Sequence, residues 1–455
     1  MEFLHLTDYQ VFPSVVPVGQ EVTVTIVPRG NNCAFPEEYE YRVGVFGTAT
    51  ANRVLNKCQS VEFVCHPKNG SLSFTTTFER EQQYVIKITM PEPLRYCSNP
   101  YYQPPAHGLV PRPSDIAKPV LYLYALETDL YRLRPYKGDF HLHSSDSDGH
   151  ESSCGTLANL RRAGYDFAAL TNHYWFHSFE KVRKQWTGVE DVMTLFPAEE
   201  IHTPTEFLHA VGVGHRESIN DLYYGHREEC DNEISEIEKS LTDLPSSIDK
   251  RNYASRLWVA RKMKELGGMS ILVHPHWIWN EVYFMPEDLT IHLLESGEYD
   301  AFELLNGDSG PETNRLQTSL YFEERSKGFN IPIVGSSDCH RTDREDEKFP
   351  ATAFSLVFSE DLSFPHVKEA ILDGRCVAVE KYREDKQFRL YGSYRLVKYA
   401  NFLMLNYFPV YTELCAPQGT LLREYETEPG KEQADLIHAL YQKSESFFKK
   451  FFGRR

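Results

Sequence analysis

The sequence predicts an α/β protein in which a β/α barrel follows an N-terminal antiparallel β-sandwich. Two observations predict this order. Up to about residue 136, short apolar stretches follow the period-two pattern of half-buried strands, and turn residues separate them. From residue 137 onward, short apolar runs alternate with longer helical patterns, which is typical of β/α units. At 455 residues the chain is long enough for two or three domains.

The first 136 residues carry the strand pattern. Alternating apolar and polar residues cover 18–28, 41–47, 71–79 and 84–91. A proline-rich stretch at 99–115 is expected to cross the surface. The apolar run at 118–135 then predicts a last strand that leads into the barrel. We therefore expect a sandwich domain at 1–136.

Residues 137–385 alternate strands with helices. Strands are expected at 138–143, 167–173, 194–202, 207–214, 270–276, 301–307, 331–340 and 376–380. Helices are expected at 154–165, 249–267, 286–296, 312–328 and 364–375. So many β/α units favour a barrel over a small open sheet. The tail at 386–455 has strand-like aromatic stretches and then a helical pattern, and we expect it to pack on the barrel or the sandwich.

Charge and composition exclude several classes of function. The formal net charge of -17 argues against general binding of nucleic acid or of an anionic membrane, because both favour a basic surface. No apolar run approaches the roughly 20 residues of a membrane span, and no secretory signal pattern is visible. The nine cysteines are scattered without a C-x-x-C pair, which fits reduced thiols. We expect a cytoplasmic protein.

Histidines and carboxylates gather at the ends of the predicted barrel strands. His141 and His143 end the first of these strands, where residues i and i+2 point to one face. Further residues of this kind are Asp148, His173, Glu200, His209, His274, Asp338 and His340, with His209 inside its strand. The carboxyl ends of barrel strands converge on one mouth, so six imidazoles and three carboxylates would meet there. Such a set suits Zn, Mn or Fe.

Each of these patterns is weak when it stands alone. An isolated H-x-H pair is usually not a metal site, and a lone histidine is more often a structural residue that forms hydrogen bonds. Chance would scatter these residues over helices and loops. Their joint placement at strand ends therefore favours a metal centre.

In these motifs the chain resembles the PHP (polymerase and histidinol phosphatase) metallohydrolases over about residues 138–380. The stretches that carry the resemblance are DFHLHSSDSDG, LTNH, FPAEEIHT, FLHAVG, LVHPH and GSSDCH. The resemblance implies a distorted (β/α)7 barrel of the TIM-like kind and a metal-dependent hydrolase. Within that family, the phosphoesterase and carbaryl-hydrolase-like branches look most similar.

Two positions need a choice or depart from the family pattern. Asn172 stands where the second motif most often has an acid, although its neighbour His173 would be the ligand. In the third motif Glu199 and Glu200 are adjacent, and only one can point inward from a strand. We choose Glu200, and Glu199 stays the alternative.

The resemblance also implies how two or three divalent ions of Mn, Zn or Fe would be held. One ion would take His141, His143, Glu200 and Asp338. A second would share Glu200 and take His209 and His274. A third would take Asp148, His173 and His340. Because the ions outweigh three carboxylates in charge, such a site favours an anionic substrate.

We therefore expect a phosphoesterase that hydrolyses a small phosphorylated mono- or diester with a hydroxide activated at a di- or trinuclear centre. His276 could share the face of His274 and protonate the leaving group, and Arg341 could bind a phosphate. The resemblance implies supporting roles for Glu303 and Asn306. Two alternatives stay open: hydrolysis of carboxylic or carbamate esters at the same centre, and metal binding without turnover. A homo-oligomer stays open as well.

Overall fold

The computed structural model describes residues 9–29, 34–49, 61–89, 91, 120–205, 207–342, 352–382, 385 and 387–454. The proline-rich stretch at 99–115 lies outside these residues. The chain divides into two compact units. Unit 1 comprises Met1–Arg132, Phe402–Tyr407 and Glu445–Arg455, and unit 2 comprises Leu133–Asn401 and Phe408–Ser444. Residues of the tail thus belong to both units.

Unit 1 contains two sheets with one apolar core. The strands of the first are, in order, β1 (Tyr9–Phe12), β3 (Glu21–Pro28) and β6 (Leu72–Thr77). Those of the second are β2 (Val15–Pro17), β8 (Val120–Leu126), β7 (Gln82–Thr89), β4 (Tyr41–Gly47) and β5 (Val61–Cys65). Side chains from both sheets, such as Val24 and Ile86, are fully buried in the same core. The short helix α1 (Thr128–Tyr131) follows β8.

One strand pair corrects the expectation of an all-antiparallel domain. Strands β2 and β8 pair in parallel, whereas the other pairs of these two sheets are antiparallel. These two strands are far apart in the sequence, so no hairpin turn forces them to run in opposite directions.

The strands of unit 2 form two larger sheets. The first has the order β11 (Thr194–Phe196), β10 (Phe167–Leu170), β9 (Arg134–Leu142), β19 (Ala353–Ser359), β20 (Cys376–Glu380) and β21 (Arg389–Tyr391). The second has the order β12 (Ala198–Ile201), β13 (Ala210–Val213), β14 (Met269–Leu272), β17 (Ala301–Asn306) and β18 (Ile333–Ser336). Isolated bridges join Leu142 to Cys339 and His173 to Glu200, and so connect the two sheets just beyond their strand ends.

The sheets of unit 2 are mixed, which corrects the expectation of parallel β/α units throughout. Strands β9, β10 and β11 are parallel, as are β14, β17 and β18. In contrast, β13 runs antiparallel to β12 and β14, and β19 runs antiparallel to β9 and β20. The link from β12 to β13 is too short to hold a crossover helix, so these two strands pair as a hairpin. The predicted alternation of strands and helices is confirmed.

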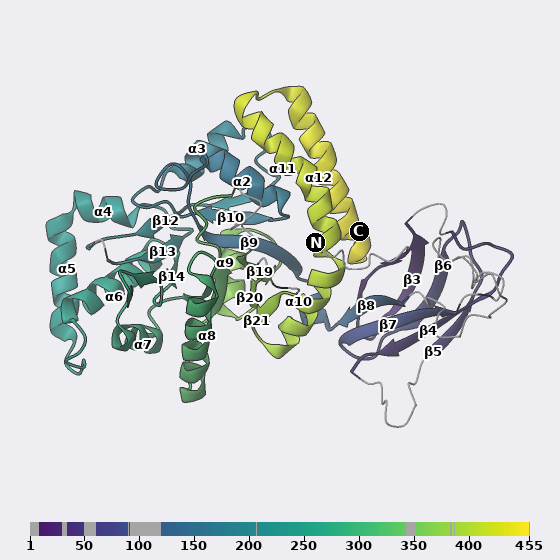
Figure 1. Ribbon diagram of the computed structural model, residues 1–455, viewed down its shortest axis with the longest axis horizontal. Coiled ribbons are helices and arrows are strands. Elements are labelled where there is room, and N and C mark those ends of the chain that lie inside the picture. Colours follow the sequence, from purple (N-terminus) through teal and green to yellow (C-terminus); the bar gives the residue numbers. More distant parts are fainter. Residues whose placement is uncertain are drawn as a thin grey trace, which may run out of the picture. The chain divides into compact units, whose positions relative to one another are not determined.

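Helices accompany the sheets of unit 2. They are α2 (Ser153–Arg162), α3 (Ser178–Gln185), α4 (Ile219–Gly225), α5 (Arg227–Ser240), α6 (Lys250–Glu265), α7 (Glu287–Ser296), α8 (Gly310–Lys327) and α9 (Phe364–Leu372). Figure 1 shows α2, α3 and α11 (Phe408–Thr427) together beside β9 and β10. Helix α6 begins where Asp249 accepts a hydrogen bond from the Asn252 amide at 2.7 Å, and Gly267 follows its end with a φ of 82°.

The tail is helical, which corrects the expectation of strand-like stretches after residue 386. Apart from the short strand β21, it forms α10 (Tyr394–Asn406), α11 and α12 (Lys431–Phe451). The buried residues of α10 include Leu396, Tyr399, Ala400 and Leu403. This is the three- and four-residue spacing of a helix, which the aromatic composition obscured. No described helix is long and apolar enough to cross a membrane.

Candidate metal centre

The first two histidines lie at the end of β9. His141 is in the strand, His143 directly follows it, and both are buried. Asp139, two residues earlier, accepts hydrogen bonds from the backbone amides of His141 and Ser337 at 3.1 Å each. This carboxylate therefore ties β9 to the residues that follow β18.

The other predicted ligands come from the ends of further strands. His173 follows β10, Glu200 lies in β12, His274 follows β14, and Asp338 and His340 follow β18. His274 and Asp338 adopt positive φ angles of 27° and 51°, which are uncommon for residues other than glycine. These turns aim the two side chains inward, where a continued strand would not.

Two expectations about local structure are wrong. Strand β18 ends at Ser336, so strand alternation does not place Asp338 and His340 on one face. His209 directly precedes β13 instead of lying inside it. Even so, all three side chains reach the same region as the other six. We call the nine residues the histidine cluster: His141, His143, Asp148, His173, Glu200, His209, His274, Asp338 and His340.

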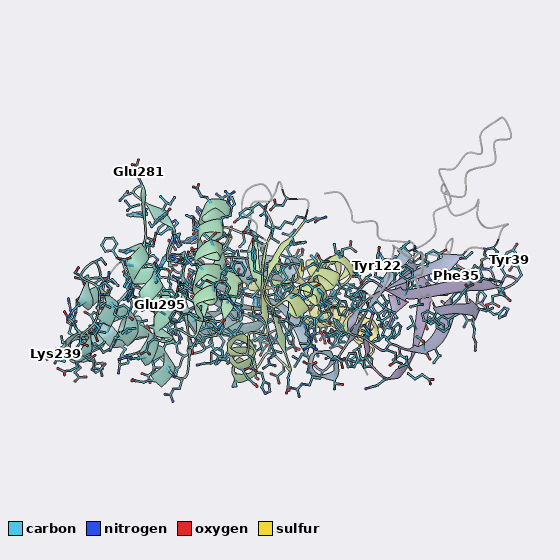
Figure 2. All side chains as sticks on the ribbon, turned by 90° about the horizontal axis from the view of Figure 1, so that it is seen from below. Phe35, Tyr39, Tyr122, Lys239, Glu281 and Glu295 are labelled. Atoms are coloured by element: carbon cyan, nitrogen blue, oxygen red, sulfur yellow. The ribbon has the colours of Figure 1, made fainter. Side chains whose placement is uncertain are left out.

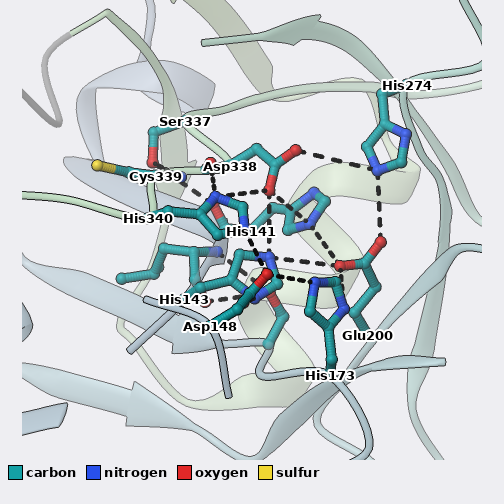
Figure 3. Close-up of polar contacts among 12 residues, drawn as sticks. His141, His143, Asp148, His173, Glu200, His274, Ser337, Asp338, Cys339 and His340 are labelled. Carbon is teal, nitrogen blue, oxygen red and sulfur yellow. Dashed lines mark hydrogen bonds and ion pairs between the residues drawn. The ribbon is translucent and has the colours of Figure 1, made fainter. Parts of the chain in front are cut away.

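The first predicted group converges closely (Figure 3). His141 Nε2 lies 3.3 Å from Glu200 Oε2 and 3.2 Å from Asp338 Oδ1. His143 Nε2 lies 3.3 Å and 3.1 Å from the same two oxygens. In a tetrahedral site with ligand bonds of about 2.0–2.1 Å, ligand atoms are roughly 3.3–3.4 Å apart. His141, His143 and Asp338 therefore offer ligand atoms close enough together to share one ion, and Glu200 adjoins them through both imidazoles.

The tautomer of His141 explains why this group needs a cation. His141 Nδ1 lies 2.9 Å from Glu303 Oε1, and both side chains are buried. A carboxylate accepts, so we assign the ring proton to Nδ1, which leaves a lone pair on Nε2. That lone pair faces carboxylate oxygens of Glu200 and Asp338. Three acceptors that face one another in a buried place repel unless protons or a metal ion lie between them. The donor set fits a divalent ion.

The other two predicted groups also come together. Glu200 Oε1 lies 3.3 Å from His274 Nε2 and 2.7 Å from His209 Nδ1. Asp148 Oδ2 lies 3.3 Å from both His173 Nε2 and His340 Nε2. The ring of His143 lies 4.2 Å from that of His340, so the third group adjoins the first. Among the described residues, the groups with ligand atoms close enough for one ion that contain Glu200 are His141, Glu200, His274 and His173, Glu200, His202, so the structure divides the residues differently from the predicted grouping.

Electrostatics in the cluster favour cations. Burial alone would raise the pKa values of Glu200 and Asp338, but the surrounding imidazoles hold both well below their ordinary values. Burial likewise opposes the charge on His173 and His340, yet neighbouring carboxylates raise their pKa values to about 10 and about 9. Without metal, protons therefore fill the role of the cation. Burial lowers the pKa of His209, the member with the weakest hold on a proton.

The choice between the adjacent glutamates is clear in the geometry. Glu199 points away from the cluster and binds the start of α4. It accepts hydrogen bonds from Ser218 Oγ at 2.7 Å and from Asn220 Nδ2 at 3.0 Å. Glu200 points the other way, into the imidazoles (Figure 3). Of the pair, only Glu200 has the surroundings of a ligand.

Asn172 also points away from the cluster. Its side-chain oxygen accepts from the Ser144 amide at 2.8 Å, and its nitrogen donates to Ser178 Oγ at 2.7 Å. The amide can both donate and accept here, which a carboxylate cannot do. Asn172 therefore joins the segment after β9 to the start of α3, and it does not contact the cluster in any described interaction.

The two predicted catalytic side chains are placed differently. Arg341 and His340 line one small pocket of about 90 Å³ together with His150. Of the residues that line this pocket, only His340 belongs to the cluster. The ring of His276 lies 5.2 Å from that of Tyr283, and no described interaction joins its side chain to the cluster. His276 is buried, and burial lowers its pKa.

Residues in supporting positions surround the ligands. Asn306 donates from Nδ2 to Glu303 Oε2 at 2.9 Å and to Asp338 Oδ2 at 3.1 Å, which fits the supporting roles implied by the resemblance. Sequence reasoning missed Asp139, although its spacing to the first two histidines places all three on one strand face. Burial raises the pKa of Asp139 to about 7. His202, two residues after Glu200, also lies beside the ligands, because its Nε2 is 2.6 Å from His173 Nδ1.

Comparisons with known proteins give structural neighbours only. No family model matches the chain, and no curated protein matches it. The chain is similar to a two-domain protein from Bacteroides vulgatus that contains a predicted PHP-like metal-dependent phosphoesterase. The identity is 18% and the TM-score 0.38, over 57% of this chain and 76% of that one.

Two further neighbours are smaller. One, from Bifidobacterium adolescentis, is named a candidate metal-dependent phosphoesterase, with 14% identity and a TM-score of 0.33 over 52% of this chain and 95% of that one. The other is an amidohydrolase from Chromobacterium violaceum with bound sulfate and no metal, with 15% identity and a TM-score of 0.32 over 47% and 89%. None of these three neighbours is named a carbaryl hydrolase. At such low similarity, the function of this chain must be argued from its own side chains.

Proposed function

We propose that this protein is a metal-dependent phosphoesterase that hydrolyses a small phosphorylated mono- or diester. The observation that carries the proposal is the position of His141 Nε2, which lies 3.3 Å from Glu200 Oε2 and 3.2 Å from Asp338 Oδ1. A buried set of acceptors that is incomplete without a cation suits catalysis by two or three divalent ions. Such ions, of Mn, Zn or Fe, would activate water and polarise a phosphoryl oxygen.

The chain's own residues would have separate tasks. Glu303 fixes the ring of His141 through Nδ1, and Asn306 holds Asp338, so the ligands are oriented before any ion or substrate arrives. Arg341, beside His340, would bind a phosphoryl oxygen and help to orient the ester. His276 is the proposed donor of a proton to the leaving oxygen, and this role requires a substrate large enough to reach its ring. An anionic substrate fits because the ions outweigh the three carboxylates.

The test is hydrolysis of chromogenic phosphate monoester, phosphate diester and carboxylic ester substrates by Mn-loaded protein. His141→Ala is the decisive variant, and His226→Ala is its control, because His226 is 60% exposed and lies outside the cluster. We expect phosphoester turnover that His141→Ala abolishes and His226→Ala keeps. Turnover of the carboxylic ester alone would assign the protein to the carboxylic or carbamate ester hydrolases. Metal binding without any turnover would favour a binding protein.

A further inference from the structure

Large aromatic side chains stand exposed around the histidine cluster. We call six of them the aromatic rim: Tyr174, Trp175, Phe207, Tyr224, Trp279 and Tyr283. Each is between 40% and 65% exposed. They come from the segment after β10, the β12–β13 link, helix α4, and the hairpin of β15 (Ile278–Trp279) and β16 (Val282–Tyr283). Exposed apolar side chains that gather in one region mark a surface that binds a ligand or a partner.

The rim is continuous with the histidine cluster on the side of the hairpin. The ring of Phe284 lies 4.3 Å from that of His209 and 5.7 Å from that of His274. Trp277 lies 5.8 Å from His274 and 5.4 Å from Trp279. A chain of ring contacts therefore connects the predicted metal ligands His209 and His274 to the exposed hairpin.

A second path of rings leads outward from His202. The ring of Tyr174 lies 4.7 Å from that of His202, which in turn contacts His173. Tyr174 also lies 6.5 Å from Tyr224 of α4. The rim thus meets the cluster through two different strand ends, as a surface that surrounds a bound molecule would.

The hairpin itself is unusually apolar for an exposed element. Asn280 and Glu281 turn it with φ angles of 48° and 68°, and Figure 2 shows Glu281 at its projecting tip. Ile278 and Val282 are 51% and 64% exposed. The only charge between residues 277 and 284 is Glu281, which is negative. A negative tip on a chain of net charge -17 disfavours an anionic membrane or a nucleic acid as the occupant.

We propose that the aromatic rim binds the alcohol part of the substrate and that this part carries a neutral aromatic ring. The inference rests on the proposed phosphoesterase function and names its substrate class as arylalkyl phosphate esters. The phosphoryl group would lie at the cluster while the ring packs against Trp279 and Tyr283 in offset or edge-to-face geometry. In the hydrolysis, the oxygen of one water bonds to phosphorus, the bond from phosphorus to the alcohol oxygen breaks, and a proton from the water ends on the released alcohol.

The experiment compares two esters that differ mainly in the ring: 2-phenylethyl phosphate and ethyl phosphate. With Mn-loaded wild-type protein we expect kcat/KM to be about tenfold higher for the phenylethyl ester, because an aromatic pair and its buried area add binding. In the double variant Trp279→Ser, Tyr283→Ser this preference should disappear. Tyr394→Ser is the matched control, since Tyr394 is 80% exposed on α10 away from the cluster, and it should keep the preference. Equal kcat/KM for the two esters in wild-type protein would overturn the proposal.

A binding measurement separates this proposal from the proposed function. Calorimetry of Mn-loaded protein with 2-phenylethylphosphonate and ethylphosphonate, neither of which is an ester, needs no turnover. Tighter binding of the aromatic phosphonate that the double variant removes would support the rim even if no phosphoester were hydrolysed. Equal binding of both phosphonates would overturn the proposal that the aromatic rim binds an aromatic ring. The hydrolysis assays would still decide separately whether the protein is a phosphoesterase. Binding to neutral phosphatidylcholine vesicles that the double variant abolishes, with no preference between the phosphonates, would assign the rim to a lipid surface instead.

Discussion

Two buried polar clusters in unit 2 differ in how their hydrogen-bonding atoms are matched. In one, which we call the Arg161 cluster, the guanidinium of Arg161 on α2 donates to Gln418 Oε1 on α11 at 2.8 Å and 2.9 Å. It also donates to the carbonyl of Tyr165 at 3.0 Å, and Tyr411 donates to Asp166 at 2.5 Å. Each of these contacts joins a donor to an acceptor. The Arg161 cluster is complete with protein atoms alone, and its role is to hold α11 against α2.

In the histidine cluster the match depends on a cation. His141 Nε2 faces carboxylate oxygens of Glu200 and Asp338, and these contacts are favourable only with a proton or a metal ion between the atoms. His143 Nδ1 and His274 Nδ1 form no hydrogen bond with any described residue. His141, Glu200 and Asp338 are buried like the Arg161 cluster, whereas Asp148 is 52% exposed at the edge of the histidine cluster. A buried polar group that its own fold leaves unmatched costs stability and persists because something else completes it. The comparison therefore separates a cluster that protein atoms complete from one whose side chains could hold a metal ion in the same unit.

We expect the largest effect on stability from a substitution that breaks the Arg161 cluster. We expect Arg161→Met to lower the free energy of unfolding by about 3–5 kcal/mol, because it removes the cation beside the buried Asp166 and leaves Gln418 Oε1 and the Tyr165 carbonyl without the donor they have in wild-type protein. Chemical denaturation measures this, and the exposed neighbour Arg162→Met is the control. The number of metal ions bound per folded chain should not change. A loss of bound metal with unchanged stability would remove the distinction between the clusters.

A substitution of one carboxylate in the histidine cluster should affect metal binding and turnover instead. We expect Asp338→Asn to lower kcat/KM more than about 100-fold, beyond the usual cost of changing a residue that only supports a ligand. The rise in melting temperature on adding Mn should also shrink, because ligand binding stabilises only in proportion to its affinity. Differential scanning fluorimetry with and without Mn tests this, and Asp361→Asn, at an exposed carboxylate, serves as the control. A full Mn-dependent shift in Asp338→Asn would contradict the assignment.

Glu303→Gln tests the residue that sets the tautomer of His141. The amide keeps the shape but loses the charge that makes the ring a better ligand, so we expect metal binding to weaken about 10- to 100-fold. Isothermal calorimetry with Mn measures the affinity. Glu324→Gln is the matched control, because Glu324 is also buried but pairs with Lys327 on α8. Equal affinity in both variants would show that Glu303 does not act through His141.

His202→Asn tests the contact behind His173. Loss of the ring frees His173 Nδ1 from its neighbour at 2.6 Å, and we expect about tenfold weaker binding of the ion that His173 would hold. The other ions should be less affected, so a calorimetric titration should lose one phase selectively. His177→Asn changes a nearby histidine that is 55% exposed and should leave every phase intact. Uniform weakening of all phases would point to a general distortion.

The affinity for metal should rise with pH. Carboxylates raise the pKa values of His173 and His340 to about 10 and about 9, above the ordinary value near 6.5. The stability that these protons give the metal-free protein is present below pH 6.5 and is lost as pH rises through 9 to 10. A metal ion must displace the same protons, so affinity should increase about tenfold per pH unit for each proton released. Calorimetry at pH 6.5 and 8.5 in two buffers tests this, and an affinity independent of pH would contradict it.

Much of the candidate site could be predicted because strand ends can be read from the sequence. His141, His143 and Glu200 lie where apolar runs stop, and the structure brings all nine predicted residues together. The turns at His274 and Asp338 could not be predicted, since their positive φ angles depend on the surrounding chain. The turn at His274 also means that the spacing of two residues does not put His276 on the same face as His274. The ring of His276 lies beside that of Tyr283 instead.

The order of strands and helices could be predicted from the sequence, but the relative directions of the strands could not. Period-two patterns and helical spacing located most of the strands and helices, yet they carry no information on whether distant strands such as β2 and β8 run in parallel. Helices α10 and α11 of the tail were missed because aromatic residues favour strands by propensity, whereas packing decided here. The helical pattern expected at the end of the tail is helix α12. The partners of Arg161 on α11 are about 250 residues away in the chain, and no local pattern indicates them.

The most direct test of the central claim is the metal content of the purified protein after removal of metal with a chelator and reloading with Mn. Inductively coupled plasma mass spectrometry should find two or three ions per chain in wild-type protein. The double variant His141→Ala, Asp338→Asn should retain fewer, while Arg162→Met should bind as many as wild-type protein. A wild-type protein that folds fully and binds no divalent ion would contradict the account, because the facing acceptors of the histidine cluster would then persist without a cation.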